Sequence, residues 1–463
     1  MLNNQEKTYI KELPIFKELK KYSEKELKQV IGDNDTLLKE LQKYDYIRYD
    51  NEKEQYNIKF VGLILTENLI IKCIPKYIPE DIPEEQKEKE FKETMKIIRK
   101  YKKQKEDFNH ENIQTGEKVS NKLTLMLYFI EDYYENGIYT NYQTIHETNG
   151  NGEINWDKTI NNHNPIHKKK NNKPYYTELE TRYNQNNTND YFRQLHEYII
   201  TESSQTLTKT GLLQIFNITP TEISDKQYND FGEKKEILEK IEKELNTEYN
   251  THKRKLLKYM HHYISNKKNY TNNKTITAYG TSTYHVIWEE ICSKVLNNKI
   301  RQEITELSLP NKKQQKNTKS LIEIIEKPKW NFKDQTTIET DRLIPDIITI
   351  QDDTFIILDA KYYDITFEKN ELKGQPGLES ITKQYLYEQA YKEFIKKAGF
   401  TKVKNAFLFP TYEKETKNKG TVKLNFLTRI PLEEIQIIML PVSTMNKLYL
   451  QNKHMKTREL RLY

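Results

Sequence analysis

One stretch of the chain, PDIITIQDDTFIILDAKYY, restricts the fold more than any other feature of the sequence. Two runs of apolar and β-branched residues flank the polar QDDT, and this pattern predicts a β-hairpin. A loop centred on QDDT pairs Ile350 with Phe355 and, further along the strands, Asp346 with Asp359. Lys361 is then expected on the same face as Asp359, because side chains alternate along a strand. An otherwise apolar hairpin thus carries three charged groups at one end.

Two carboxylates that face each other across a strand pair repel, so this arrangement needs a compensating charge. A divalent cation would supply it, because oxygen ligands of this kind are the ones that Mg²⁺ prefers. Lys361 could then stabilise an anionic transition state or orient a water molecule. The alternative is that both aspartates reach solvent at the strand ends and that Lys361 pairs with one of them.

A helix expected at about residues 282–304 places a further carboxylate near the hairpin. Glu289 lies on the edge of the apolar stripe of this helix. A carboxylate at the edge of a core is costly unless it is paired or bound to a metal. Glu289 therefore either joins the charged hairpin or hydrogen-bonds a nearby backbone group or His285.

The rest of the last domain predicts an α/β core with a mixed sheet. A helix is expected at about 379–398, with Gln384 and two tyrosines on one face. These three residues could contribute to the charged site or could form only a polar or interfacial stripe. Strands are expected at 403–412 and 423–432. Helices would then flank the sheet that contains the hairpin.

The length of 463 residues predicts about two or three domains. We expect an N-terminal mixed α/β domain at 1–115, a mostly helical middle region with polar loops at 116–274, and the hairpin domain at 275–463. The chain is thus an α+β and α/β multidomain protein.

Within the N-terminal domain, residues 14–45 are expected to be helical, with Ser23 as an N-cap and Gly32 as a stop. The following segment, YNIKFVGLILTENLIIKCIPKYI, predicts an apolar hairpin around TEN. An exposed apolar strand surface would mark a protein contact, whereas a buried one would form only the core of a small domain.

Charge and cysteine content narrow the class of protein. The 75 basic and 68 acidic residues leave a net charge of +7, which permits nucleic-acid binding without requiring it. Cys73 and Cys292 form no CxxC pair, which argues against a disulfide scaffold or a zinc site. No apolar run is as long as the core of a signal peptide or a membrane span. We therefore expect a cytoplasmic protein without a membrane partner.

The order of these features resembles that of the PD-(D/E)xK nuclease superfamily, carried here by Pro345-Asp346, Asp359 and Lys361. The segments FVGLILTENLIIKCIPKYI, GEINWDKTI, YGTSTYHVIWEE and ITKQYLYEQAY extend the likeness. Together they resemble the LlaJI family of restriction endonucleases, which is related to the McrC nuclease subunit of McrBC-type systems. Residues of about 205–255 match no pattern that we can assign.

This resemblance implies roles for the residues singled out above. Asp346, Asp359 and Glu289 would ligate Mg²⁺, with Mn²⁺ as a possible substitute, and Lys361 would assist the attacking water. Gln384 would lie beside the lysine or the DNA backbone. The chain would cut double-stranded DNA together with an AAA+ GTPase subunit of the McrB type, to which the N-terminal domain at 1–115 would dock, in a system with cognate methyltransferases. The sequence itself contains no GxxxxGK[ST] phosphate loop.

Two other functions fit the sequence. The chain could be a self-sufficient type II restriction endonuclease, with HKKKNNKPYY and THKRKLLKYMHHY as basic and aromatic DNA contacts. It could instead be a non-catalytic adaptor that binds DNA or a partner. The presence of Asp346, Asp359, Lys361 and Glu289 argues against the adaptor. The recognised DNA sequence, the effect of methylation, the cut position and the stoichiometry are not encoded in any of these patterns.

Overall fold

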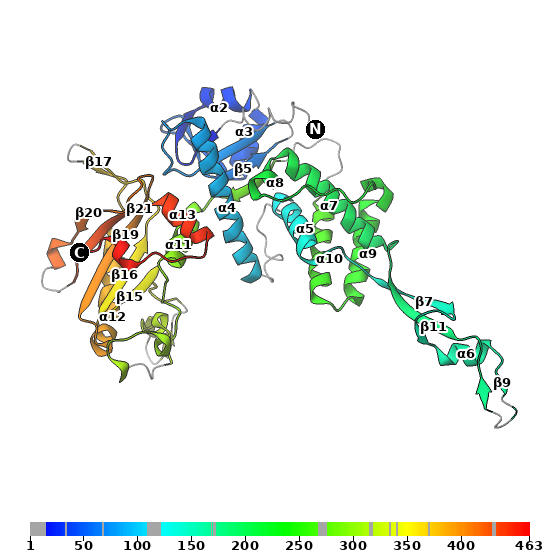
Figure 1. Ribbon diagram of the computed structural model, residues 1–463. Helices are drawn as coiled ribbons and strands as arrows, with labels where there is room; N and C mark the ends of the chain where they lie inside the picture. Colours follow the sequence, from blue (N-terminus) through cyan, green and yellow to red (C-terminus); the bar gives the residue numbers. More distant parts are fainter. Residues whose placement is uncertain are drawn as a thin grey trace. The chain divides into compact units, whose positions relative to one another are not determined.

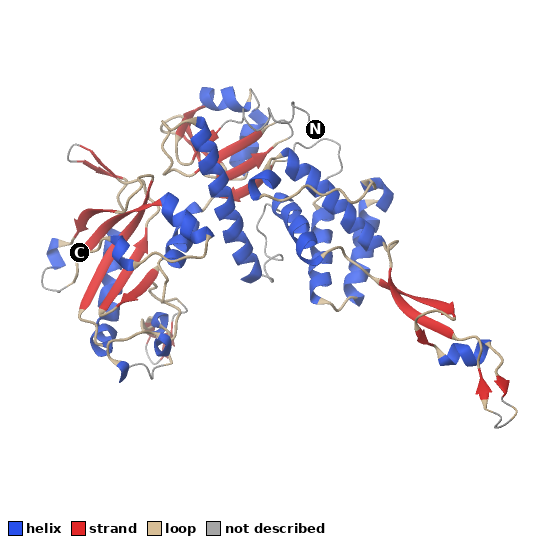
Figure 2. Ribbon diagram, in the orientation of Figure 1, coloured by secondary structure: helices blue, strands red, loops and turns tan. Residues whose placement is uncertain are grey.

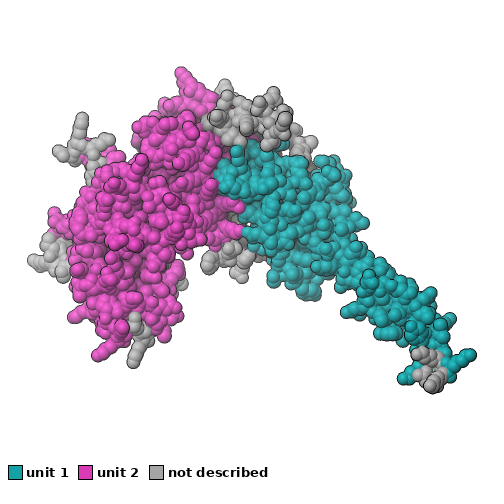
Figure 3. Space-filling model, in the orientation of Figure 1, with its two compact units in different colours: residues 1–11, 118–278 teal, residues 12–117, 279–463 magenta. Residues whose placement is uncertain are grey.

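The computed structural model forms two compact units (Figure 3). Unit 1 comprises residues 1–11 and 118–278, and unit 2 comprises 12–117 and 279–463. The structure describes residues 15–32, 35–66, 69–108, 122–167, 169, 173–266, 276–313, 318–332, 335–338, 341–368, 371–427 and 432–463. None of the helices in these ranges is long and apolar enough to cross a membrane.

A first module, here called the N-terminal module, comprises residues 15–108 together with the strand at 277–281. Its main sheet has the order β1 (Ile15–Lys17), β6 (Ile70–Ile74), β5 (Val61–Leu65) and β12 (Thr277–Thr281). A second sheet has the order β2 (Lys21–Ser23), β4 (Gln55–Ile58) and β3 (Ile47–Asp50). The helices are α2 (Glu24–Ile31), α3 (Asp35–Lys43) and the long α4 (Glu84–Phe108).

The sequence predictions hold for part of this module. Ser23 caps α2 in a capping box, and the helix ends at Gly32, as predicted. The predicted helix at 14–45 is wrong in its first turns, because β1 pairs with β6 and β2 pairs with β4. The apolar hairpin forms, as β5 and β6, but its side chains are buried. It is therefore the core of the module and not an exposed surface for a partner.

Unit 1 combines a helical bundle with a β-arm (Figures 1 and 2). The bundle contains α5 (Lys122–Asn136), α7 (Tyr191–Lys209), α8 (Leu212–Phe216), α9 (Lys234–Thr247) and α10 (Thr251–Ser265), with a 3-10 turn at Tyr228–Phe231. The arm contains β7 (Tyr142–Thr148), β8 (Glu153–Ile154), α6 (Trp156–Asn162), β9 (Ile166–His167), β10 (Pro174–Tyr175) and β11 (Glu180–Asn186). The helices were predicted from the sequence, whereas the arm was not.

The rest of unit 2, here called the C-terminal module, comprises residues 282–463. Its five-stranded sheet has the order β15 (Ile347–Gln351), β16 (Thr354–Ala360), β19 (Lys402–Thr411), β21 (Ile435–Pro441) and β20 (Lys417–Val422). The helices are α11 (Tyr284–Val295), α12 (Leu378–Ala398) and α13 (Val442–Leu450). Two small hairpins are β13 (Lys329–Phe332) with β14 (Gln335–Ile338) and β17 (Thr366–Glu368) with β18 (Glu371–Lys373). Single 3-10 turns occupy Ile304–Glu306, Leu321–Glu323, Asn425–Leu427 and Thr457–Leu460.

The sheet is mixed, as predicted. β16, β19 and β21 run parallel, while β15 and β20 are antiparallel strands at the two edges. Helix α12 covers the face that carries Phe355 and Ile357, and it ends at the left-handed Gly399. Helix α11 is shorter than predicted. The strand predicted at 423–432 is wrong over the described residues 423–427, and the buried strand is β21 instead.

Candidate active site

The end of the β15–β16 hairpin brings the two predicted aspartates together. The strands pair from Gln351 opposite Thr354 to Ile347 opposite Leu358, so the next pair in register is Asp346 and Asp359. The charge of Asp359 acts on Asp346 and raises the pKa of its carboxyl group, so the two groups lie close to each other. The Ala360 N–H also donates to Asp346 Oδ2 at 2.9 Å. The backbone of one strand therefore fixes the side chain of the other.

Lys361 lies directly beyond β16 and faces the same pair. Its Nζ is 2.6 Å from Asp359 Oδ2 and 5.8 Å from the centroid of the Phe407 ring. Its backbone N–H donates to the carbonyl oxygen of Leu408 at 2.9 Å, which extends the parallel β16–β19 ladder by one residue. The lysine is thus held at its main chain by β19 and at its ammonium by Asp359.

Helix α11 brings Glu289 to the same group. The apolar stripe predicted for this helix is buried, and Glu289 is half-buried at its edge. Trp288 Nε1 donates to the carbonyl oxygen of Leu408 at 3.3 Å, the atom that also accepts from Lys361 N. The charges of Asp359 and Lys361 both act on Glu289. One carbonyl of β19 therefore holds both the helix with the glutamate and the strand end with the lysine.

Negative charge exceeds positive charge in this group. Burial, together with the charges of Asp359 and Glu289, raises the pKa of Asp346 to about 7. Burial also raises the pKa of Asp359, although Lys361 opposes this, and burial followed by the charge of Asp359 raises the pKa of Glu289. One ammonium therefore does not compensate three carboxylates that are withdrawn from water.

The donor chemistry fits a divalent cation. All three groups offer carboxylate oxygens, which are hard ligands of the kind that Mg²⁺ binds. Asp359 Oδ2 is buried and accepts no hydrogen bond, although Lys361 Nζ lies beside it. Within the described ranges, no three His, Cys, Asp or Glu side chains are already arranged to hold a metal ion. Asp346, Asp359 and Glu289 as metal ligands all stay predictions.

Gln384 makes its hydrogen bonds elsewhere. It is fully buried on α12, and its Nε2 donates to the Ile357 carbonyl at 3.3 Å and to Asn405 Oδ1 at 2.6 Å. Asn405 in turn donates to Glu388 Oε2 at 3.2 Å. These contacts place Gln384 in a polar network between α12 and the sheet. Its predicted position beside Lys361 or the DNA backbone is not among them, and a role in the reaction stays a prediction.

Asn298, which follows α11, supports the site and was missed from the sequence. Its Nδ2 donates to the Asp346 carbonyl at 2.7 Å, and its Oδ1 accepts from Ile348 N at 3.0 Å. The side chain thus hydrogen-bonds to the backbone on both sides of Ile347 and fixes the start of β15. An asparagine after a helix is common in turns, so the sequence carried no signal for this role.

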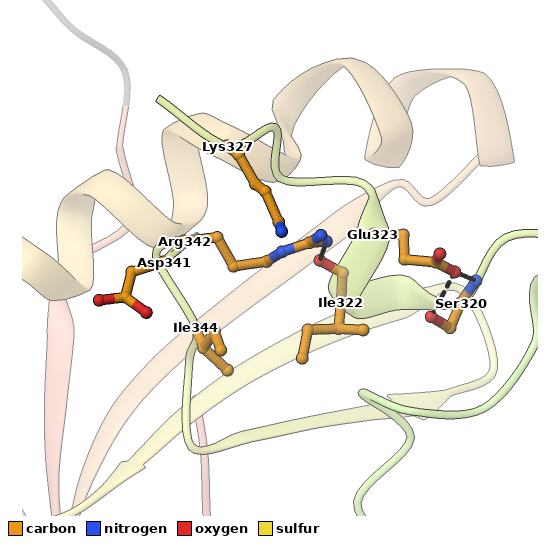
Figure 4. A pocket seen from close by; sticks show the side chains of 7 residues that line it. All are labelled: Ser320, Ile322, Glu323, Lys327, Asp341, Arg342 and Ile344. Atoms are coloured by element: carbon orange, nitrogen blue, oxygen red, sulfur yellow. Dashed lines mark hydrogen bonds between the residues drawn. The ribbon is translucent and has the colours of Figure 1, made fainter. Parts of the chain in front are cut away.

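A cavity of about 610 Å³ opens beside the segment that leads into β15 (Figure 4). Its lining residues are Ser320, Ile322, Glu323, Lys327, Asp341, Arg342 and Ile344. The Arg342 guanidinium is engaged, because its Nη1 donates to the Ile322 carbonyl at 2.8 Å. Two acidic and two basic groups balance in this lining, and none of the predicted site residues takes part. The cavity is therefore separate from the carboxylate group.

Comparison with known proteins gives three similarities. A family model described as LlaJI restriction endonuclease matches residues 60–323 and 315–445. The chain is 29% identical over 462 residues to "Type II restriction enzyme BsuMI component YdjA" of Bacillus subtilis (strain 168), covering 96% of this chain and 91% of that protein. The structure of McrC bound to McrB AAA+ hexamers of Thermococcus gammatolerans aligns over 95% of this chain and 98% of that chain, at 11% identity and a TM-score of 0.40. This structural similarity is too low to carry an argument.

Proposed function

Because the chain belongs to the LlaJI family of restriction endonucleases, we propose that it is the DNA-cleaving subunit of a restriction system. It hydrolyses phosphodiester bonds of double-stranded DNA with Mg²⁺, or with Mn²⁺ in its place. The observation that carries this proposal is the group of Asp346, Asp359 and Lys361 at the hairpin end, where two carboxyl groups, one buried and one partly buried, lie beside one ammonium. We assign the five-stranded sheet to the PD-(D/E)xK fold, on the order α11, β15, β16, α12.

The proposed chemistry divides between the cation and the side chains. When bound, the cation polarises the scissile phosphate and lowers the pKa of a water molecule. Asp346 and Asp359 hold it, with Glu289 as the next donor. Lys361 keeps its ammonium beside Asp359 and offers N–H donors to the attacking water and to the negative charge that grows on the phosphate.

We also propose that a second subunit, an AAA+ GTPase of the McrB type, recognises the DNA. The chain has no phosphate loop of its own, and its net charge of +7 is small for a protein that must find a DNA site alone. The Bacillus relative is described as a component of a type II restriction enzyme, which favours an enzyme of several chains. Cognate methyltransferases would protect the host DNA, and the system would work in the cytoplasm.

The β-arm of unit 1 is the surface that best suits such a partner. Trp156, Ile160, Ile166 and Tyr175 are each more than half exposed, which is unusual for large apolar side chains gathered on one small element. The buried β5–β6 hairpin cannot serve this purpose. Assembly would therefore use unit 1, while the C-terminal module of unit 2 cuts.

The test is to assay cleavage of DNA by the purified chain with Mg²⁺, alone and with the GTPase and GTP. We expect weak or no specific cutting by the chain alone and efficient cutting by the complete system. Lys361→Ala serves as the control for contaminating nuclease. Efficient cutting at a defined sequence by the chain alone would instead establish a self-sufficient endonuclease, and no cutting by the complete system would support an adaptor.

A further inference from the structure

The residue after the lysine is anchored in the N-terminal module. Tyr362 lies in a tight turn directly after the strand, because the Tyr363 N–H donates to the Lys361 carbonyl at 3.0 Å. It is buried, and its hydroxyl donates to Glu18 Oε2 at 2.5 Å. Glu18 directly follows β1, so this bond joins the strand end beyond β16 to the first strand of the N-terminal module.

Lys76, which lies just beyond β6, closes the same contact from another side. Its Nζ donates to the Tyr362 carbonyl at 2.7 Å and lies 4.2 Å from the centroid of the Tyr362 ring. Its backbone N–H donates to Glu18 Oε2 at 3.3 Å. Tyr362 is therefore held at its hydroxyl, its ring and its carbonyl by two residues of one module.

The same cluster reaches the helix that carries Glu289. The ring of Tyr284, the first residue of α11, lies 5.4 Å from that of Tyr362. The hydroxyl of Tyr77 lies 3.3 Å from that of Tyr284. Both elements that supply the site beyond Asp346 are thus packed against residues that directly follow β6.

We propose that Glu18 and Tyr362 are positioning residues of the active site, through which the N-terminal module sets the place of Lys361. This inference rests on the proposed function of the lysine. Lys361 is the last residue of the β16–β19 ladder, so its main chain is fixed on one side by Leu408 and on the other by Tyr362. A displacement of about 1 Å at a reacting group can cost about a hundredfold in rate. The N-terminal module then belongs to the catalytic apparatus.

The chain offers a matched control at a second contact between the same two modules. Tyr449 on α13 is held in the same manner: Lys100 Nζ donates to its carbonyl and lies 4.6 Å from its ring centroid. Its hydroxyl donates to Gln104 Oε1 at 3.1 Å. Tyr449→Phe therefore removes an equivalent bond without touching the residue beside Lys361.

The experiment compares Tyr362→Phe, Glu18→Gln and Tyr449→Phe with wild type in the complete system with partner, GTP and Mg²⁺. We expect the single-turnover cleavage rate to fall roughly ten- to a hundredfold in the first two variants and to stay unchanged in the third. DNA affinity and the melting temperature should match those of the control. The double variant Glu18→Gln/Tyr362→Phe should be little slower than Tyr362→Phe alone, because both changes weaken the same contact.

A second readout does not depend on cleavage. The rate at which an amine reagent acylates Lys361, measured against pH by mass spectrometry, should change in Tyr362→Phe and Glu18→Gln but not in Tyr449→Phe. If the complete wild-type system cuts no DNA but both variants change the acylation profile of Lys361, the positioning role stands and the proposed function is rejected. Cleavage and labelling equal to wild type in both variants, or an equal loss in Tyr449→Phe, would overturn the inference. If Tyr362→Phe fails to fold, Glu18→Gln decides alone.

Discussion

The helical bundle of unit 1 and the C-terminal module of unit 2 both bury titratable groups, but the two regions differ in the charges that surround those groups. In unit 1, burial lowers the pKa of His196 to about 4, and the neutral ring accepts the Tyr139 N–H at Nδ1. In the C-terminal module, burial raises the pKa of Asp346 and Asp359, which face each other. Burial favours the neutral form in both regions, but in the sheet three carboxyl groups gather beside one ammonium, which leaves an imbalance of charge. Such imbalance is typical of a functional site.

The largest effect should come from breaking the charged group. Lys361→Ala or Asp359→Ala is expected to reduce cleavage about a hundred- to ten-thousandfold, because each removes a group that acts on the reaction. Circular dichroism should show a folded protein that still assembles with its partner. Lys402→Ala, an exposed change at the far end of the same sheet, should cut normally. Near wild-type cutting by either site variant in Mg²⁺ would refute the assignment of the site.

The next effect concerns the bundle and acid. The folded pKa of His196 lies below its ordinary value of 6.5, so the unfolded state binds more protons between about pH 4 and 6.5. Unit 1 should therefore lose stability as the pH falls through this window, by roughly 3 kcal/mol in total. Hydrogen exchange of the α7 amides at several pH values measures this loss. His196→Gln should flatten the dependence, and an unchanged slope in that variant would contradict the prediction.

A smaller effect of opposite sign is expected in the C-terminal module. The folded pKa of Asp346, about 7, lies above its ordinary value of 3.8, so its contribution to stability is lost as the pH rises through 7. Asp346→Asn should then stabilise the metal-free protein at pH 8 by about 1–2 kcal/mol. Mg²⁺ should stabilise wild type but not this variant. Thermal unfolding of Asp352→Asn, an exposed change in the loop of the same hairpin, supplies the control. A lower melting temperature in Asp346→Asn would refute the imbalance of charge.

The two regions also differ in how far the sequence predicts them. The β15–β16 register followed from two apolar runs on either side of a short polar loop, and α12 followed from helical spacing up to Gly399. The arm did not, because β7 and β11 are polar on both faces and give no alternation to detect. The strand β21 is buried at every position, so it lacks the alternation that marks a half-exposed strand.

Within the site, contacts between residues close in the sequence were easier to predict than contacts between distant residues. Asp346 and Asp359 are joined by one hairpin, so pairing rules bring them together. Glu289 was found only as a misplaced carboxylate on an apolar helix edge. The contact of Glu18 with Tyr362 spans 344 residues and exists only once both modules have folded. Local patterns cannot specify such a contact.

One atom, the carbonyl oxygen of Leu408, accepts hydrogen bonds from both Lys361 N and Trp288 Nε1. It acts as a common reference point for a helix and a strand end that are remote in the sequence. If the twist of the sheet changed, both elements would move together with this oxygen atom. The distance between Glu289 and Lys361 would then stay nearly the same. Since the acceptor belongs to the main chain, no side-chain replacement at position 408 can delete it. The alignment of the site therefore depends on a backbone atom, which a side-chain substitution does not remove.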